Sequence, residues 1–279
     1  MSGGAPAGVD AWRVYWQPGC TSCLRARELL RAHGIAFESI NVRERPEALA
    51  ALAARGLRTV PVVAHGERFV LAQDLDELAA FIGVRVDRER LPLDVLARRL
   101  ERLLEIAAAL VRALPPERWQ ERLPQRDRSW LDLGFHVAKI VQAFLAAARG
   151  GELRYEDYEE RAPADAQSAG AVGDRIDRTR EAVAAWAAGA AAAAAAESAR
   201  ELRTYFGRRS AWTVLERSVW HVAQHVRQLQ HLAIEVAGTS PATRLAPGDL
   251  AGLPVPEAVW DREIAPPGTA AHGDAQRIY

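Results

Sequence analysis

The chain has 279 residues and a formal net charge of +0, from 36 basic and 36 acidic side chains. Hydrophobic residues make up 49% and charged residues 26%, which is typical of a globular protein of about two domains and excludes a disordered chain, a collagen or a small disulfide scaffold. The balanced charge argues against a general nucleic-acid binder. Because no apolar run approaches the roughly 20 residues of a membrane span and no signal peptide is visible, we expect a cytoplasmic protein without a membrane partner.

The first third of the chain alternates short apolar runs with helical patterns. After a short N-terminus that we expect to be flexible, residues 1–11, the sequence predicts strands over 12–16, 36–40, 60–64 and 68–71 and helices over 21–33, 46–55 and 74–82. This order predicts an α/β domain over residues 12–83.

A charged linker, residues 84–92, leads to long helical patterns only. Helices are predicted over 93–114, 129–149, 171–199 with an interruption at Gly189, and 211–237. The 20-residue gap between the second and third helices suits the crossover connection of a four-helix bundle over residues 93–238. The tail, residues 239–279, is rich in Pro and Gly and has no periodicity. We expect it to drape over the bundle and its last dozen residues to be disordered.

The only two cysteines, Cys20 and Cys23, lie where the first helix begins. A helix N-terminus stabilises a thiolate, so Cys20 is the predicted nucleophile. The CxxC spacing places Cys23 one turn further on the same side, where it can resolve a mixed disulfide. The alternative is a buried, inert pair or half of a metal site.

Residues 12–83 resemble a glutaredoxin. Residues 16–23, Trp-Gln-Pro-Gly-Cys-Thr-Ser-Cys, resemble its active-site loop, and Thr59-Val60-Pro61 resembles its Thr-Val-Pro turn. The resemblance implies a thioredoxin-like fold, a cis Pro61, and a Val60 backbone that pairs with the cysteine moiety of a bound thiol. Gln73 and Asp74 fall where the family holds the γ-glutamyl end of glutathione, and only Asp74 keeps the family pattern, which leaves the identity of the thiol open.

Three of the seven histidines have the spacing of metal ligands. His221 and His225 lie one turn apart on the predicted fourth helix, at the shoulder of its apolar stripe, and His136 lies at the shoulder of the second helix. Three imidazoles on two helix flanks could meet at an open cleft and hold one ion. The alternative is three unrelated histidines.

Residues 93–238 resemble a four-helix bundle of the DinB/YfiT type. Residues 128–136, which end in His136, match its second-helix motif, residues 221–229 match its HxxxH motif, and residues 204–207, Thr-Tyr-Phe-Gly, also fit the family. The resemblance implies a divalent metal, zinc or nickel, and transfer of a low-molecular-weight thiol such as mycothiol or bacillithiol.

The two halves together predict an enzyme of low-molecular-weight thiol metabolism. Its partners would be a small thiol (mycothiol, bacillithiol or glutathione) and a small electrophilic or disulfide substrate, and a homodimer is left open. One alternative is a glutaredoxin-type disulfide reductase whose helical domain only binds a thiol, a metal or a partner. A second is a redox or metal sensor without turnover.

Overall fold

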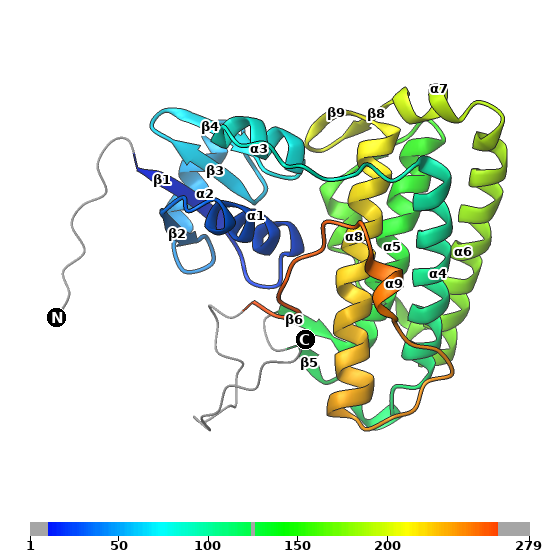
Figure 1. Ribbon diagram of the computed structural model, residues 1–279. Helices are drawn as coiled ribbons and strands as arrows, with labels where there is room; N and C mark the ends of the chain where they lie inside the picture. The colour runs from blue at the N-terminus through cyan, green and yellow to red at the C-terminus, as the bar shows by residue number, and fades with distance from the viewer. Residues whose placement is uncertain (1–10, 124–125, 262–279) are drawn as a thin grey trace.

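The computed structural model describes residues 11–123 and 126–261, so most of the predicted flexible N-terminus and the predicted disordered last dozen residues lie outside the described residues. A small α/β domain lies beside a larger helical domain, and the last described segment of the chain runs between them (Figure 1).

The small domain is built on a four-stranded sheet in the order β2-β1-β3-β4. Its elements are β1 (Trp12–Trp16), α1 (Thr21–Ala32), β2 (Phe37–Asn41), α2 (Pro46–Ala53), β3 (Val62–His65), β4 (Arg68–Leu71) and α3 (Leu75–Ile82). β1 runs parallel to β2 and antiparallel to β3, and β3 is antiparallel to β4. This mixed sheet with helices on its faces is the thioredoxin-like fold expected from the sequence.

Helix α3 illustrates how local sequence sets the boundaries in this domain. The Asp74 carboxylate accepts hydrogen bonds from the backbone N–H groups of Asp76 and Glu77 and so caps the first turn. Gly83, with φ 74°, adopts the left-handed conformation that ends the helix. Leu78 on the inner face is fully buried in the core that lies between α1, α3 and the sheet.

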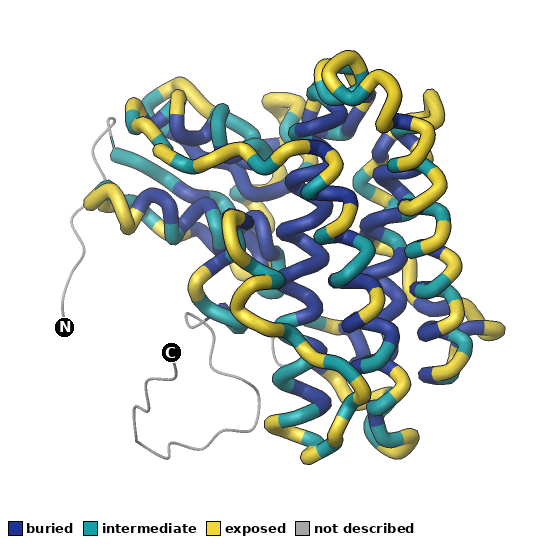
Figure 2. Tube along the Cα trace, turned by 45° about the vertical axis from the view of Figure 1, so that its right-hand side comes forward, coloured by how far each residue is buried: buried dark blue, intermediate teal, exposed yellow. Residues whose placement is uncertain are grey.

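The helical domain is a four-helix bundle. Its long helices are α4 (Leu93–Arg112), α5 (Trp130–Ala148), α6 (Ala169–Ala191) and α8 (Ala211–Gln230). Helices α4 and α5 each pack against both α6 and α8. The inward faces are buried and the outward faces exposed along the bundle (Figure 2). α5 is the one described helix long and apolar enough to cross a membrane, but 78% of that apolar window is buried inside the protein.

Shorter elements complete this domain and were not all predicted. They are η1 (Pro116–Arg118), β5 (Arg122–Leu123), β6 (Arg126–Ser129), β7 (Glu152–Leu153), η2 (Tyr155–Tyr158), η3 (Ala164–Ala166), α7 (Ala194–Ala199), β8 (Glu201–Thr204), β9 (Gly207–Ser210), η4 (His231–Val236) and α9 (Pro247–Leu250). The predicted interruption at Gly189 is wrong, because the third helix continues through it and stops at Ala191. A lone glycine costs a helix about 1 kcal/mol without ending it. Beyond Val183 only Ala190 is buried, so the alanine run has little core contact to hold it.

The described end of the chain ties the two domains together. We call residues 253–261 the C-terminal strap. On its α1 side, Arg25 donates to the Pro254 carbonyl at 3.0 Å, and the Glu28 carboxylate accepts from the N–H groups of residues 257 and 258. On its α8 side, the Gln224 amide donates to the carbonyls of residues 258 and 259, at 2.9 and 2.8 Å. The strap therefore lies between α1 and α8, as Figure 1 shows.

Candidate functional site at the domain junction

The two cysteines occupy the turn from β1 into α1. Cys20 is the N-cap of α1, and its Sγ accepts a hydrogen bond from the Cys23 N–H at 3.2 Å. The two side chains form a disulfide. Cys23 is fully buried, whereas Cys20 is partly exposed. In the reduced protein, Cys20 is therefore the sulfur that a ligand can reach, and the unpaired N–H groups of the helix end stabilise its thiolate.

A bundle arginine touches the cysteine loop directly. Gly19, with φ 67°, precedes Cys20, and a Cβ atom at that position would lie 3.0 Å from the side chain of Arg126. The Arg126 guanidinium donates to the Gly19 carbonyl at 3.4 Å. The missing side chain thus lets an arginine of β6 lie against the loop that carries the nucleophile.

The predicted thiol-binding residues divide into two groups. Val60 and Gln73 line one pocket with Cys20, and the Val60–Pro61 peptide is cis, as expected. The Gln73 side-chain amide donates to the Val60 carbonyl at 2.8 Å. Thr59 lies outside this lining, and Asp74 is used elsewhere, because its carboxylate caps α3 and pairs with Arg209 of β9 at 3.4 Å.

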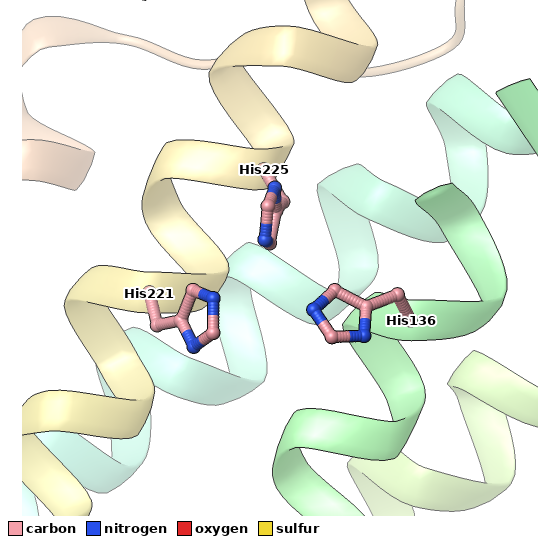
Figure 3. Close-up of side chains that lie close together, drawn as sticks. All are labelled: His136, His221 and His225. Atoms are coloured by element: carbon pink, nitrogen blue, oxygen red, sulfur yellow. The ribbon is translucent and has the colours of Figure 1, made fainter. Parts of the chain in front are cut away.

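The three predicted histidines come together inside the bundle. His136 projects from α5, and His221 and His225 project from α8 toward it (Figure 3). The ring centroid of His136 lies 5.6 Å from that of His221 and 5.0 Å from that of His225. One nitrogen atom from each ring lies within 4.8 Å of a nitrogen atom of the other two. Among the described residues, these three histidines form the group that could hold a metal ion.

The nitrogen atoms of the cluster fit a cation. Nδ1 of His136, Nδ1 of His221 and Nε2 of His225 are buried and have no hydrogen-bond partner. His225 Nδ1 lies 2.8 Å from the Gln228 side-chain oxygen, a contact that orients the ring and leaves Nε2 free to be a ligand. Three neutral imidazoles with one open position match the donor set of a catalytic zinc site.

Burial keeps the three imidazoles neutral. Desolvation lowers the pKa of His136 and His221 well below the usual value, and neighbouring histidines and arginines add to the effect. Desolvation lowers the pKa of His225 to about 3. The expected open cleft is wrong, because each of the three side chains is at most 7% exposed. Access is confined to small hollows at the domain junction.

Arg217 connects the histidine cluster to the cysteine loop. It lies on α8 one turn before His221 and is 4% exposed. Its guanidinium donates to Gln73 Oε1 at 2.7 Å and to Ser22 Oγ at 3.3 Å in the small domain. Within the bundle it donates to the hydroxyls of Tyr158 and Tyr205, at 3.2 and 3.0 Å. This one buried side chain thus forms hydrogen bonds with both domains and lies beside both sites.

One pocket opens onto both sites. Its wall carries Cys20 together with His136 and His221, and the remaining lining residues are Gln17, Thr21, Ser22, Val60, Gln73, Arg126, Tyr155, Tyr158, Glu159, Tyr205 and Arg217. His225 instead lines a neighbouring hollow with Gly19, Arg126 and Trp260. The redox sulfur and two histidines of the cluster therefore face the same pocket.

The sequence reasoning missed Arg217 and the tyrosines around it. A signal for Arg217 was present, because residues 217, 221, 224, 225 and 228 form a polar stripe at helical spacing on a helix that is otherwise apolar on this side. No comparable pattern marks Tyr155, Tyr158 or Tyr205, which lie in short irregular segments.

The fold and site define a two-domain protein in which a thioredoxin-like dithiol domain is joined to a histidine-bearing four-helix bundle. Comparison with known proteins agrees with this division: the Glutaredoxin family model matches residues 13–70, and the DinB superfamily model matches residues 99–229. Glutaredoxin-like protein NrdH from Escherichia coli (strain K12) and from Shigella flexneri is 39% identical over 54 residues, which is 19% of this chain and 67% of the relative. No solved structure gives a significant match. The chain belongs to the glutaredoxin family through its first domain, and its second domain matches the DinB superfamily model.

Proposed function

We propose that this protein is a thiol-dependent enzyme in which a dithiol exchange site and a metal-dependent thiol-transfer site share one pocket. The observation that carries the proposal is the common wall formed by Cys20, His136 and His221. A small thiol whose sulfur reaches Cys20 would lie beside the histidines without leaving the pocket. We also propose a cytoplasmic location, where small thiols keep a CxxC pair reducible.

The dithiol chemistry follows from the exposure of the two sulfurs. The Cys20 thiolate attacks one sulfur of a small-molecule disulfide, and the other half of that disulfide leaves as a thiolate and takes a proton. Cys23 then attacks Cys20, which closes the protein disulfide and releases the second half as a thiol. Two molecules of a small thiol reduce the protein disulfide again and leave as their own disulfide, so the cycle balances.

The histidine cluster supplies a second chemistry. A zinc or nickel ion bound there would lower the pKa of a coordinated thiol, so that the thiol is a nucleophile toward an electrophilic carbon at neutral pH. Gln228 orients His225 for this role, and Arg217 fixes α8 against the cysteine loop.

Two activities of the purified full-length protein test the proposal. The first is reduction of a small disulfide, and the second is conjugation of 1-chloro-2,4-dinitrobenzene with a small thiol after zinc is restored to chelator-treated protein. We expect Cys20→Ser to abolish the first, and His221→Ala to reduce zinc content and conjugation at least tenfold. His33→Ala, at an exposed position, is the matched control.

The pattern of losses distinguishes the alternatives. If His221→Ala leaves conjugation unchanged, the transfer site does not exist and the protein is a disulfide reductase with a helical binding domain. If His221→Ala abolishes both activities while the fold and the Cys20 thiol remain intact, the shared pocket acts as one composite site.

A further inference from the structure

A strand of the bundle carries two arginines beside the cysteine loop and the histidine cluster. Arg126 and Arg128 lie two residues apart on β6, so both side chains project from the same face of the strand. Arg126 lines the cysteine–histidine pocket, the hollow beside His225, and a third, wider pocket. Arg128 lines the latter two. All three hollows therefore share Arg126, and two of them also share Arg128.

The wide pocket has an excess of positive charge. We call it the arginine pocket; its lining is Pro18, Arg43, Arg126, Asp127, Arg128, Glu159 and Arg161. Both of its carboxylates are already engaged, since Glu159 pairs with Arg126 at 2.8 Å and Asp127 pairs with Arg161 at 2.9 Å. Arg43 donates only to the neutral Gln17 amide oxygen, at 3.1 Å. Within the described part of the chain, Arg43 and Arg128 thus have no carboxylate partner.

The charge of Arg128 is buried and has no ion-pair partner among the described residues. Its side chain is 4% exposed, and its guanidinium donates to the backbone carbonyl of Tyr158. Desolvation, with repulsion from Arg126, lowers the pKa of Arg128 to about 10, so the group stays protonated at neutral pH although its surroundings disfavour the charge. A buried charge is costly unless an opposite charge accompanies it. The carboxylates of Glu159 and Asp132 act on it from a distance, but no described carboxylate forms an ion pair with it, so a bound anion would be its direct partner.

We propose that the arginine pocket binds an oxyanion group, a carboxylate or a phosphate, of the small thiol whose sulfur pairs with Cys20. The proposal rests on the proposed function in one respect, that Cys20 exchanges with small thiols. The geometry favours it because Arg126 lines both pockets and donates to the carbonyl of Gly19, next to Cys20. A thiol with an acidic group a few bonds from its sulfur can then reach both the nucleophile and the guanidinium groups. The substrate class is an anionic rather than a neutral low-molecular-weight thiol.

Thiol exchange on Cys20 measures this preference directly. In full-length Cys23→Ser protein, the Cys20 thiolate attacks the disulfide form of a probe, the probe S–S bond breaks, and one half leaves as a thiolate that takes a proton. The probes are mercaptosuccinate, with two carboxylates, and 2-mercaptoethanol, which is neutral. Mass spectrometry of the intact protein in a mixture of both gives the ratio of the two mixed disulfides.

We expect the mercaptosuccinate adduct to be favoured about tenfold more in the Cys23→Ser protein than after a further Arg128→Gln substitution, since intrinsic differences between the thiols cancel in that comparison. Arg43→Gln, at an exposed position, should lower the ratio about threefold and covers the case in which Arg128→Gln does not fold. Arg178→Gln removes the same charge at an exposed site on α6 and should leave the ratio unchanged. The preference should weaken when salt is raised from about 0.02 to 0.5 M.

Equal ratios with and without Arg43 and Arg128 would overturn the proposal. If neither probe forms an adduct, the exchange role of Cys20 falls and with it the proposed function. Calorimetric titration of the oxidised protein with inorganic phosphate then decides the arginine pocket independently: binding that Arg43→Gln weakens supports an oxyanion site, and no binding overturns it.

Discussion

The buried histidine cluster makes the metal-free protein sensitive to mild acid. Unfolding exposes His136, His221 and His225 to water, where an imidazole has a pKa of about 6.5. In the folded protein the pKa of each is far lower, and for His225 it is about 3. At pH 5.5 the unfolded chain therefore binds protons that the folded protein does not, and acid favours unfolding. Stability from this source is complete above about pH 6.5 and is lost as the pH falls below it.

The size of the effect follows from proton linkage. A group with a pKa of about 6.5 unfolded and far below 5.5 folded contributes about 1.4 kcal/mol to the difference in unfolding free energy between pH 7.5 and 5.5. Three such groups contribute about 4 kcal/mol, which is a large share of the about 5–15 kcal/mol that stabilises a typical domain. Saturating zinc should raise the free energy of unfolding at both pH values, because the ion binds the folded form, and should leave the loss between them in place, because the unfolded chain still takes up the same protons.

Guanidinium unfolding of chelator-treated protein, followed by circular dichroism at pH 7.5 and 5.5, measures this loss. His225→Leu, of similar volume, should reduce the loss by about 1.4 kcal/mol, whereas His33→Asn at an exposed position should leave it unchanged. An identical loss in the wild type and in His225→Leu would refute the reasoning, because it would mean that the cluster accepts protons as readily when folded as when unfolded.

Three further substitutions test the packing of the bundle and of the domain junction. Gly134→Ala should destabilise the bundle by about 1–3 kcal/mol, because the added Cβ would lie 2.5 Å from a methyl group of Val111. Gly189→Ala has open space around it and should stabilise the helix by about 0.5–1 kcal/mol. Thermal unfolding of both variants measures the contrast, and equal shifts in the two would contradict it. Arg217→Met should lower the free energy of unfolding by about 2–4 kcal/mol and loosen the contact between the domains, because four oxygen atoms lose their hydrogen-bond donor. Limited proteolysis at the linker measures the loosening, and unchanged cleavage would count against a bridging role.

The parts of this protein that the sequence predicted are those governed by local rules. The strand-to-helix turn at Cys20 and the cap at Asp74 are decided by a few neighbouring residues, so their patterns are visible directly. Helix spacing placed residues 221 and 225 on one face, whereas the addition of His136 rested on its place at a helix shoulder and on the resemblance to the DinB family. Metal binding itself stays a prediction.

Such local rules could not predict the contacts at the junction between the domains. The contacts of Arg217 with Ser22 and Gln73 join residues 195 and 144 positions apart, and the bond from Arg25 to Pro254 spans 229. Such contacts depend on how two separately stable bodies dock, which no local periodicity encodes. The closed environment of the histidines has the same origin, since part of their cover comes from the neighbouring domain and from the C-terminal strap.

The C-terminal strap gives the molecule an order of assembly. Residues 253–261 leave the ribosome after both domains have been synthesised, yet they supply hydrogen bonds to α1 and α8 and an ion pair between Asp261 and the buried Arg27. Before this segment is made, the linker and the direct contacts between the domains are the links that join them. In that interval the hollow beside His225, which Trp260 later helps to line, is less covered than in the finished protein. A segment made after both domains thus closes one approach to the histidines.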